Sequence, residues 1–524
     1  MSDAALLEAL RAAAGAEGVR TDADSLDLSA SDLHVQGVSP AAMVRPASAE
    51  AVAATVAAAT AQGYAVIPRG GGLSYTGGYA PPSARTVAID LGGLSRIIDI
   101  AEDDMVVTAE AGVTWKQIHD ALRPRGLRLP FFGTFSGAGA TVGGGLSHGA
   151  LFFGSARYGS AAETVLELEV ALADGSLLRT GQGALAAGSK PFLRSFGPDL
   201  TGLFVHDGGA FGIKTRASLR MIRAPAVQGY GSFAFADLAV AARALSEIAR
   251  ADLADEVYVL DPTAAHSFSD APARTAWAVL REAGGPVPAM RALAELARGG
   301  ARPIPAGSYS LHWVAAGRSE TAVREDLSRA GRIAADHGGR RIAATVPRVA
   351  RATLFSSLDA VLDADGERWA ALNAKVAHSD AHELMTAFDA MIAPHLADMA
   401  DKGVTLTRLA SALGNHSFSF EPVFHWRDAW LPLHRRALSQ ARAEALSEPA
   451  PNPDARALVN RLRQETVELF RRLGAASNQI GRTYPYLEAL APAPAALLQG
   501  VKRLLDPTCL MNPGVLGLNK EILS

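Results

Sequence analysis

The stretch Pro68-Arg69-Gly70-Gly71-Gly72-Leu73-Ser74-Tyr75-Thr76-Gly77-Gly78 follows a short apolar run, Ala65–Ile67, and this order predicts a strand that enters a glycine loop. Consecutive glycines let several backbone N–H groups converge without Cβ clashes, as binding of a pyrophosphate requires. Ser74 adds a hydroxyl donor and Arg69 a charge. The spacing matches neither a Rossmann nor a P-loop motif. A flexible glycine loop without a ligand is the alternative interpretation.

A second glycine-rich segment lies about seventy residues further on and reads Gly137-Ala138-Gly139-Ala140-Thr141-Val142-Gly143-Gly144-Gly145-Leu146-Ser147-His148-Gly149. Two such segments predict one extended ligand that is held from two sides. Phe131-Phe132 before this segment and Phe152-Phe153 after it are candidates to wall a flat heterocycle. Packing in the core explains these phenylalanines equally well.

Composition narrows the class of protein. The chain has 524 residues, enough for two or three modules, and its net charge of −3 without a basic block argues against a nucleic-acid partner. Cys509 is the only cysteine, which excludes an intrachain disulfide and Cys-rich zinc or iron–sulfur sites. The first residues predict an amphipathic helix in place of a signal peptide. We therefore expect a cytoplasmic protein, and peripheral contact with a membrane electron acceptor is compatible with this expectation.

The pattern of elements changes near residue 226. Before it, short helices and strands alternate among many glycines, and Thr164–Leu172, Asp174-Gly175 and Leu177–Thr180 together predict a β-hairpin. After it, longer helical patterns appear, such as Glu320–Ala335 behind the predicted strand Tyr309–Val314. This second part is typical of an α+β module. A proline-rich loop at 447–453 precedes a helix predicted over 457–473, and the end of the chain is again rich in turns.

Five motifs in order suggest a family. The two glycine segments are followed by Arg157-Tyr158-Gly159, by Gly208-Gly209-Ala210-Phe211-Gly212-Ile213-Lys214-Thr215 and by Asp506-Pro507-Thr508-Cys509-Leu510-Met511-Asn512-Pro513-Gly514. Together they resemble the vanillyl-alcohol-oxidase/p-cresol-methylhydroxylase (PCMH-type) superfamily of FAD enzymes, in its FAD-linked oxidase and dehydrogenase branch. The resemblance implies an α+β fold with a two-part FAD-binding domain, residues 1–225 and 474–524, and an inserted α+β substrate (cap) domain, residues 226–473.

The resemblance also implies which residues bind FAD. The first segment would hold the pyrophosphate, the second would lie along the ribityl chain and isoalloxazine, and the motif near residue 212 would meet the adenine-bearing half. The implied cofactor-binding residues are Arg69, Gly70, Gly71, Gly72, Leu73, Ser74, Gly77, Gly78, Thr141, Gly143, Gly144, Ser147, His148, Gly212, Ile213 and Asn512.

The chain departs from the family pattern at two places. Members with an 8α-histidyl flavin bond have His where this chain has Leu73, so we expect no covalent bond from the first loop, and for His148 we expect hydrogen bonding. Relatives of D-lactate, glycolate and D-2-hydroxyglutarate dehydrogenases often carry the metal motif His-x-Gly-Asp-Gly-Asn-x-His. The comparable stretch here, Leu413–Glu421, keeps a Gly-Asn, a His and a Glu but lacks the first His and the Asp, so we expect no metal.

Candidates for the chemistry cluster in two segments. If residues 417–424 form a strand, Glu421 and His416 point to opposite faces unless Pro422 introduces a bulge, which leaves His425 or His416 as the base. Packing explains either histidine as well. Near the end of the chain, Arg482 and Tyr484 form a candidate clamp for a carboxylate or phenolate. A further polar cluster, Lys375–Ser379, is explained equally by helix caps.

The leading functional hypothesis is an FAD-dependent oxidoreductase that transfers hydride from a small hydroxy acid or alcohol to flavin N5. An alternative is oxidation of a para-substituted phenol, which the phenylalanines and the Arg482–Tyr484 pair would suit. An ether-forming relative, alkyl-dihydroxyacetonephosphate synthase, is less favoured because its histidine-rich run is not visible. A non-catalytic flavin-binding protein is the alternative from another class. The expected partners are a small-molecule substrate, an electron acceptor (oxygen, a quinone, a cytochrome or another flavoprotein) and a second copy in a homodimer.

Overall fold

The first glycine loop leaves an edge strand of a small sheet. In the computed structural model, which describes residues 3–264 and 304–523, this sheet has the order β1-β2-β4-β3. Its strands are β1 (Val19–Arg20), β2 (Ala42–Val44), β4 (Thr86–Asp90) and β3 (Ala65–Arg69). β2, β4 and β3 run parallel, and α3 (Ala49–Ala61) is the crossover helix between β2 and β3. Ser48 caps α3, because its side chain accepts a hydrogen bond from Ala51 N at 3.2 Å.

The remainder of the N-terminal unit is built on an antiparallel five-stranded sheet. Its order is β5 (Ile97–Ala101), β6 (Val106–Glu110), β10 (Ile213–Arg220), β8 (Val165–Ala171) and β9 (Leu177–Arg179). The predicted hairpin is β8–β9, and Gly175 in its turn has a φ of 82°. α4 (Trp115–Leu122) begins at Thr114 with a capping box formed with Gln117. The second glycine segment runs into α5 (Val142–His148), which packs beside this sheet.

The second unit contains one large antiparallel sheet. Its eight strands have the order β15-β12-β14-β13-β18-β19-β16, with β17 also pairing β19. The strands are β12 (Val227–Phe235), β13 (Glu256–Leu260), β14 (Tyr309–Gly317), β15 (Arg340–Arg341), β16 (Arg368–Ala371), β17 (Ala374–Ala377), β18 (Thr405–Leu413) and β19 (Ser417–Trp426). The chain passes into β12 directly after β11 (Ile222–Arg223), which still pairs with β7 (Leu127–Arg128) of the first unit.

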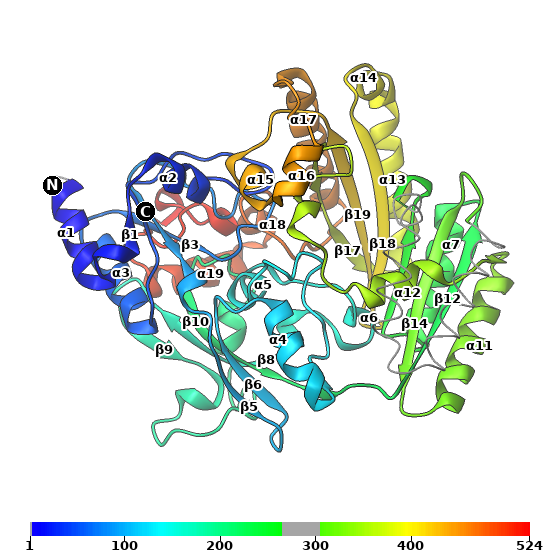
Figure 1. Ribbon diagram of the computed structural model, residues 1–524, viewed down its shortest axis with the longest axis horizontal. Coiled ribbons are helices and arrows are strands. Elements are labelled where there is room, and N and C mark those ends of the chain that lie inside the picture. Colours follow the sequence, from blue (N-terminus) through cyan, green and yellow to red (C-terminus); the bar gives the residue numbers. More distant parts are fainter. Residues whose placement is uncertain (1–2, 265–303, 524) are drawn as a thin grey trace.

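The two faces of the large sheet differ in chemistry because side chains alternate along each strand. One face buries Phe418, Phe420, Phe424 and Trp426 of β19. A layer of helices covers this face, as the contact of Phe420 with Phe388 at 5.2 Å between ring centroids illustrates. The helices are α7 (Leu238–Arg250), α11 (Glu320–Asp336), α13 (Ala381–Ile392) and α17 (Pro453–Arg472). The opposite face carries polar side chains such as Glu421 together with apolar ones such as Tyr258 and Leu409, and it lies toward the first unit (Figure 1).

The end of the chain returns to the first unit. Met511 forms a parallel bridge with Val66 of β3, and Asn512 N donates to Val66 O at 2.8 Å. The Lys502 ammonium group in α19 (Pro492–Leu505) donates to Ala210 O at 2.6 Å. Figure 1 accordingly shows the red C-terminal elements among the blue N-terminal ones. This is the two-part α+β architecture that the resemblance implied.

Most predicted elements are present with small shifts at their ends. The predicted helix over 457–473 begins four residues earlier, at Pro453, because proline fits the first helical position and Asn452 caps it. The predicted amphipathic first helix is α1 (Asp3–Ala14), which packs on α3. Shorter helices complete the described chain, among them α2 (Ala23–Ala30), α6 (Ser155–Tyr158), α12 (Thr345–Ala352), α15 (Pro432–Ala437) and α18 (Tyr486–Ala489). None of the described helices combines the length and apolar character needed to cross a membrane.

Candidate active site

The two glycine segments touch each other directly. An added Cβ at Gly70 would lie 2.3 Å from the Thr141 hydroxyl oxygen, and one at Gly71 would lie 2.2 Å from Gly139 O. Only glycine permits this approach. The backbone N–H groups of residues 71–74 have no acceptor in the part of the chain that the structure describes. Unpaired N–H groups in a glycine loop are what an anionic ligand requires.

The second segment contributes a capped helix start and a buried histidine. The Thr141 side chain accepts from Gly144 N at 3.3 Å at the start of α5. His148 at the end of α5 is 6% exposed, and neither ring nitrogen has a hydrogen-bond partner among the described residues. Burial lowers the pKa of His148 to about 3, so its imidazole is neutral. Two unpaired ring nitrogens agree with the predicted hydrogen-bonding role of His148.

A single pocket joins the predicted cofactor segments. Residues from the first loop, from α5 and from the Gly212–Ile213 motif line it. The lining residues are Pro68, Gly70, Tyr79, Leu91, Gly143, Gly144, Ser147, Gly212, Ile213 and Lys214. A pocket walled by three glycine-containing segments, beside unpaired N–H groups, fits a dinucleotide such as FAD.

Several of the predicted cofactor residues hold the protein together. Arg69 turns away from the pocket and donates to Ser31 O at 2.7 Å, and the Ser74 hydroxyl pairs with the Thr76 hydroxyl at 2.9 Å. Gly77 N donates to the buried Asp32 carboxylate at 2.7 Å. Leu73 packs in a hydrophobic cluster. These contacts shape the first loop, so a direct contact of these side chains with the cofactor is not what the structure favours.

Asn512 and Arg482 form a structural joint. The Asn512 amide donates to Gly78 O at 2.9 Å and Gly208 O at 2.7 Å, and its oxygen accepts from Arg482 Nη2 at 2.8 Å. The Arg482 guanidinium also donates to three backbone carbonyls, those of Gly77, Ala80 and Pro513. These contacts argue against the predicted substrate clamp, because the Arg482 donors that should bind a carboxylate already bind the protein.

Tyr484 has a similar structural position. Its hydroxyl accepts from Asn373 N at 2.7 Å and donates to Asn373 O at 3.1 Å. Burial raises the pKa of Tyr484 to about 12, so the phenol keeps its proton. Tyr484 therefore orients the backbone of Asn373.

The two histidines predicted as candidate bases, His416 and His425, lie in different surroundings. His416 is exposed in the turn between β18 and β19, and the regular pairing of Pro422 with Arg408 shows no bulge. His425 contacts the Asp363 carboxylate through Nδ1 and the Thr407 hydroxyl through Nε2 at 2.9 Å. It lies four positions beyond Glu421 along β19, a distance of about 13 Å. Neither position favours a role as the base.

Sequence reasoning named Lys375 and Glu421 separately but did not predict that they lie together with Asn373 and Asn478. We name Lys375, Asn373, Asn478 and Glu421 the Lys375 cluster. Lys375 is 8% exposed, and its ammonium group donates to the side-chain oxygens of Asn373, at 3.2 Å, and of Asn478. Glu421 lies on the neighbouring strand, one alternate position from Ser419, which pairs with Lys375. Strand alternation in 373–375 and 419–421 was the available signal.

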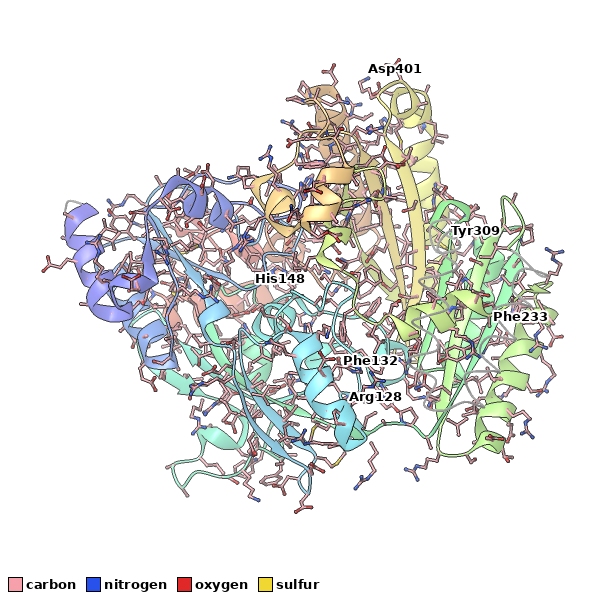
Figure 2. All side chains as sticks on the ribbon, in the orientation of Figure 1. Arg128, Phe132, His148, Phe233, Tyr309 and Asp401 are labelled. Carbon is pink, nitrogen blue, oxygen red and sulfur yellow. The ribbon has the colours of Figure 1, made fainter. Side chains whose placement is uncertain are left out.

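Both glycine segments reach this cluster. Asn478 donates through Nδ2 to Gly149 O at 2.9 Å, directly after His148. Tyr75 of the first loop interacts electrostatically with Glu421, and its ring meets Trp369 edge-on at 5.5 Å. The Lys375 cluster is therefore next to the cofactor loops. In Figure 2, His148 marks this region between the first unit and the yellow strands.

Burial perturbs both charged groups of the cluster in opposite directions. Desolvation raises the pKa of Glu421 to about 7, and the charge of Lys375 partly offsets this. Desolvation lowers the pKa of Lys375 to about 7, with Glu421 acting in the opposite sense. Groups poised near neutrality can exchange protons with a bound ligand. No group of three or more His, Cys, Asp or Glu side chains suited to a metal occurs among residues 3–264 and 304–523.

Comparison with known proteins agrees with this geometry. The profile of the family described as FAD binding domain matches residues 40–181, which include both glycine segments. This match identifies an FAD-binding domain in the first unit of the chain. Its cofactor is FAD, which the pocket and the glycine loops fit.

The relatives are similar over less than half of the chain. A probable mitochondrial D-lactate dehydrogenase of Danio rerio is 33% identical over 221 residues, covering 42% of this chain and 43% of that protein. A D-2-hydroxyglutarate dehydrogenase of Xanthomonas citri is 31% identical over 187 residues, covering 36% and 38%. The matches thus span less than half the length of these relatives.

Solved structures show the fold over nearly the whole chain. p-Cresol methylhydroxylase has a TM-score of 0.74 at 18% identity, with 98% of this chain and 97% of that chain covered. Alkyldihydroxyacetonephosphate synthase has a TM-score of 0.68 at 16% identity, covering 97% and 85%. At this identity the similarity establishes the two-domain PCMH-type fold.

Proposed function

We propose that the protein is an FAD-dependent oxidoreductase that oxidises a small hydroxy acid. The observation that carries this proposal is the position of the Lys375 cluster, which places a buried ammonium group and a partly buried carboxylate beside both cofactor loops. Residues of the pocket, such as Gly70, Gly144 and Ser147, would hold FAD. When bound, FAD supplies a two-electron acceptor for the hydride of the substrate C–H bond.

The chain's own residues provide binding and proton transfer. We propose that the substrate binds on the face of the large sheet that carries Glu421, because helices cover the other face. Aromatic side chains at the cluster, Tyr75 and Trp369 among them, limit the access of water. An acidic and a basic group with pKa values near neutrality suit the removal of a hydroxyl proton.

The relatives support a hydroxy acid in preference to a phenol. Proteins named D-lactate and D-2-hydroxyglutarate dehydrogenase are similar in sequence, whereas p-cresol methylhydroxylase and a 4-ethylphenol oxidase are similar in fold. The hydrogen bonds of Arg482 to the protein argue against the phenolate clamp on which the phenol alternative relied. An electron acceptor must reoxidise the flavin, and we propose oxygen, a quinone, a cytochrome or another flavoprotein for this role. A homodimer remains part of the proposal.

An anaerobic titration tests the function. The purified protein, loaded with FAD, is mixed with D-lactate, glycolate, D-2-hydroxyglutarate and vanillyl alcohol while its visible spectrum is recorded. We expect a hydroxy acid to bleach the flavin. Bleaching by vanillyl alcohol alone would support the phenol alternative, and a spectrum unchanged by all four compounds would contradict the proposed substrate class.

A variant of the first loop tests the cofactor site. We expect Gly71→Asp to lose FAD during purification, because its side chain would meet Gly139 O and place a charge beside the pyrophosphate. Gly500→Asp is the control, since an added Cβ there meets nothing within 4 Å. Equal FAD content in both variants would contradict the assignment of the loop.

A further inference from the structure

Lys375 is held so that one of its three N–H groups is left for a ligand. Two donate to the Asn373 and Asn478 side-chain oxygens. The backbone of Lys375 is fixed as well, because its N–H donates to Ala476 O at 2.7 Å and its carbonyl accepts from Ala476 N at 2.9 Å. The ammonium group is therefore a positioned donor in a desolvated place.

Asn373 supplies a second donor of defined direction. Its Oδ1 accepts from Lys375 Nζ, from the Ser477 hydroxyl at 2.9 Å and from Asn478 N at 3.1 Å. Three donors on one atom fix the orientation of the amide. Its Nδ2 is left without an acceptor among the described residues, although the side chain is only 2% exposed. An unpaired buried donor is costly unless a ligand completes it.

Glu421 brings the opposite chemistry to the same face of the sheet. The charge of Lys375 lowers the pKa of Glu421 and so partly offsets the effect of burial. The two side chains nevertheless form no direct salt bridge in the described structure. A carboxylate that is near an ammonium group without pairing with it keeps both groups available to a ligand. The cluster thus offers two donors for an anion and one acceptor for a proton.

Resting on the proposed function, we propose that Lys375 and Asn373 bind the carboxylate of a 2-hydroxy acid, while Glu421 accepts the proton of its hydroxyl group. The O–H bond breaks, its proton goes to Glu421, and its electron pair forms the second C–O bond of a 2-oxo acid. The C–H bond breaks at the same carbon, and its hydride leaves to the oxidised flavin. The substrate loses two electrons and two hydrogens, which the flavin and Glu421 receive.

The other charged groups that face the cluster do not compete for this role. Burial raises the pKa of Tyr75 and Tyr484, so both phenols stay protonated near neutral pH. Burial lowers the pKa of His206, which lies near Lys375, so this imidazole is neutral at pH 7. Arg463 is occupied by Ala371 O and Tyr75 O. Glu421 and Lys375 are therefore the groups that change charge.

Binding of oxalate, which cannot be oxidised here because it carries no C–H bond, tests the anion site apart from turnover. Calorimetry with FAD-loaded protein should show oxalate binding that weakens about 10- to 100-fold in Lys375→Met, because a charge-assisted hydrogen bond is lost. Lys190→Met is the matched control, since Lys190 is 79% exposed and far along the chain. Unchanged oxalate affinity in Lys375→Met would contradict the proposal that Lys375 binds the substrate carboxylate.

Glu421→Gln separates binding from proton transfer. We expect oxalate affinity to be kept or improved, because a negative charge is removed, while kcat falls by about 100- to 10,000-fold. Glu320→Gln, an exposed side chain, is the control. A kcat within threefold of the parent would overturn Glu421 as the base. Visible flavin absorbance and the melting temperature confirm that each variant is folded.

Measurements on the unaltered protein test the same proposal without depending on whether the variants fold. Oxalate affinity should decrease as pH rises through about 7, where Lys375 loses its proton. An oxalate affinity that does not change with pH would contradict the proposal that Lys375 binds the carboxylate. If no hydroxy acid bleaches the flavin but oxalate binds as described, the proposed function fails and the anion site stands. If hydroxy acids bleach the flavin while both variants behave as the parent, the function stands and this inference fails.

Discussion

Two charged clusters lie between the FAD-binding unit and the large sheet, and they differ in whether their acidic and basic side chains form direct ion pairs. In the first, which we name the arginine cluster, Asp255 accepts a hydrogen bond from Arg128 at 2.6 Å and forms an ion pair with Arg157 at 3.0 Å, and Glu256 forms an ion pair with Arg351 at 3.0 Å. In the Lys375 cluster, Lys375 and Glu421 form no direct salt bridge, and Asn373 Nδ2 lacks an acceptor among the described residues.

This difference assigns a role to each cluster. Arg128 and Arg351 also lie over the Phe132 ring, with guanidinium carbons 4.6 and 4.3 Å from its centroid, so the arginine cluster is a packed joint between the units. Figure 2 labels Arg128 and Phe132 at this joint. Direct ion pairs such as Asp255–Arg128 hold the two units together, whereas Lys375 and Glu421, which form no direct pair, are open to interaction with a ligand.

The largest expected effect is at the arginine cluster. Asp255→Asn leaves Arg128 and Arg157 without their carboxylate, and we expect the free energy of unfolding to fall by about 3–5 kcal/mol. Urea unfolding followed by circular dichroism measures this. Asp401→Asn, at a side chain that is 83% exposed, should change it by less than about 0.5 kcal/mol. A small effect of Asp255→Asn would remove the distinction between the clusters.

Arg482→Ala tests whether Arg482 stabilises the protein or binds the substrate. We expect a loss of about 1–3 kcal/mol in unfolding free energy and weaker retention of FAD, because the carbonyls of Gly77 and Ala80 lose their donor. The KM for a hydroxy acid should stay within threefold in the FAD-loaded fraction. Arg324→Ala, an exposed arginine, is the control. A large rise in KM with normal stability would restore Arg482 as a substrate residue.

We expect the pH profile of kcat/KM to depend on the two titrating groups of the Lys375 cluster. Glu421, with its pKa raised to about 7, is protonated at lower pH and cannot accept a proton, so kcat/KM rises about tenfold per pH unit toward neutrality. Above about 7, Lys375 loses its proton and substrate binding weakens, so kcat/KM falls again. Glu421→Gln should remove the acid limb, and Lys375→Arg the alkaline limb. Both limbs persisting in both variants would assign the profile to other groups.

The smallest expected effect is at His425. His425→Gln should leave kcat within about twofold, because the imidazole pairs with Asp363 and Thr407 away from the Lys375 cluster. Steady-state kinetics with the hydroxy acid found in the titration measures this. A fall in kcat of a hundredfold would return His425 to the position of base and make the comparison of clusters irrelevant to catalysis.

The sequence by itself determined the cofactor site and most of the fold. Glycines at 70–72 and 143–145 permit close backbone approach wherever they meet, and motif order resembled one family, so FAD and the two-part architecture followed from local chemistry. Caps such as Ser48 and Thr114 are equally local, since they act within one helical turn.

The tertiary structure alone decided which polar side chains meet. Lys375, Glu421 and Asn478 are far apart in the chain, and only strand register and the return of residues 476–478 to β17 place them together. The same register leaves His416 in an exposed turn. Arg482 donates hydrogen bonds to the carbonyl groups of Gly77 and Ala80 in the first loop. Residue type shows what chemistry a side chain offers, but its partners depend on long-range pairing that no local pattern encodes.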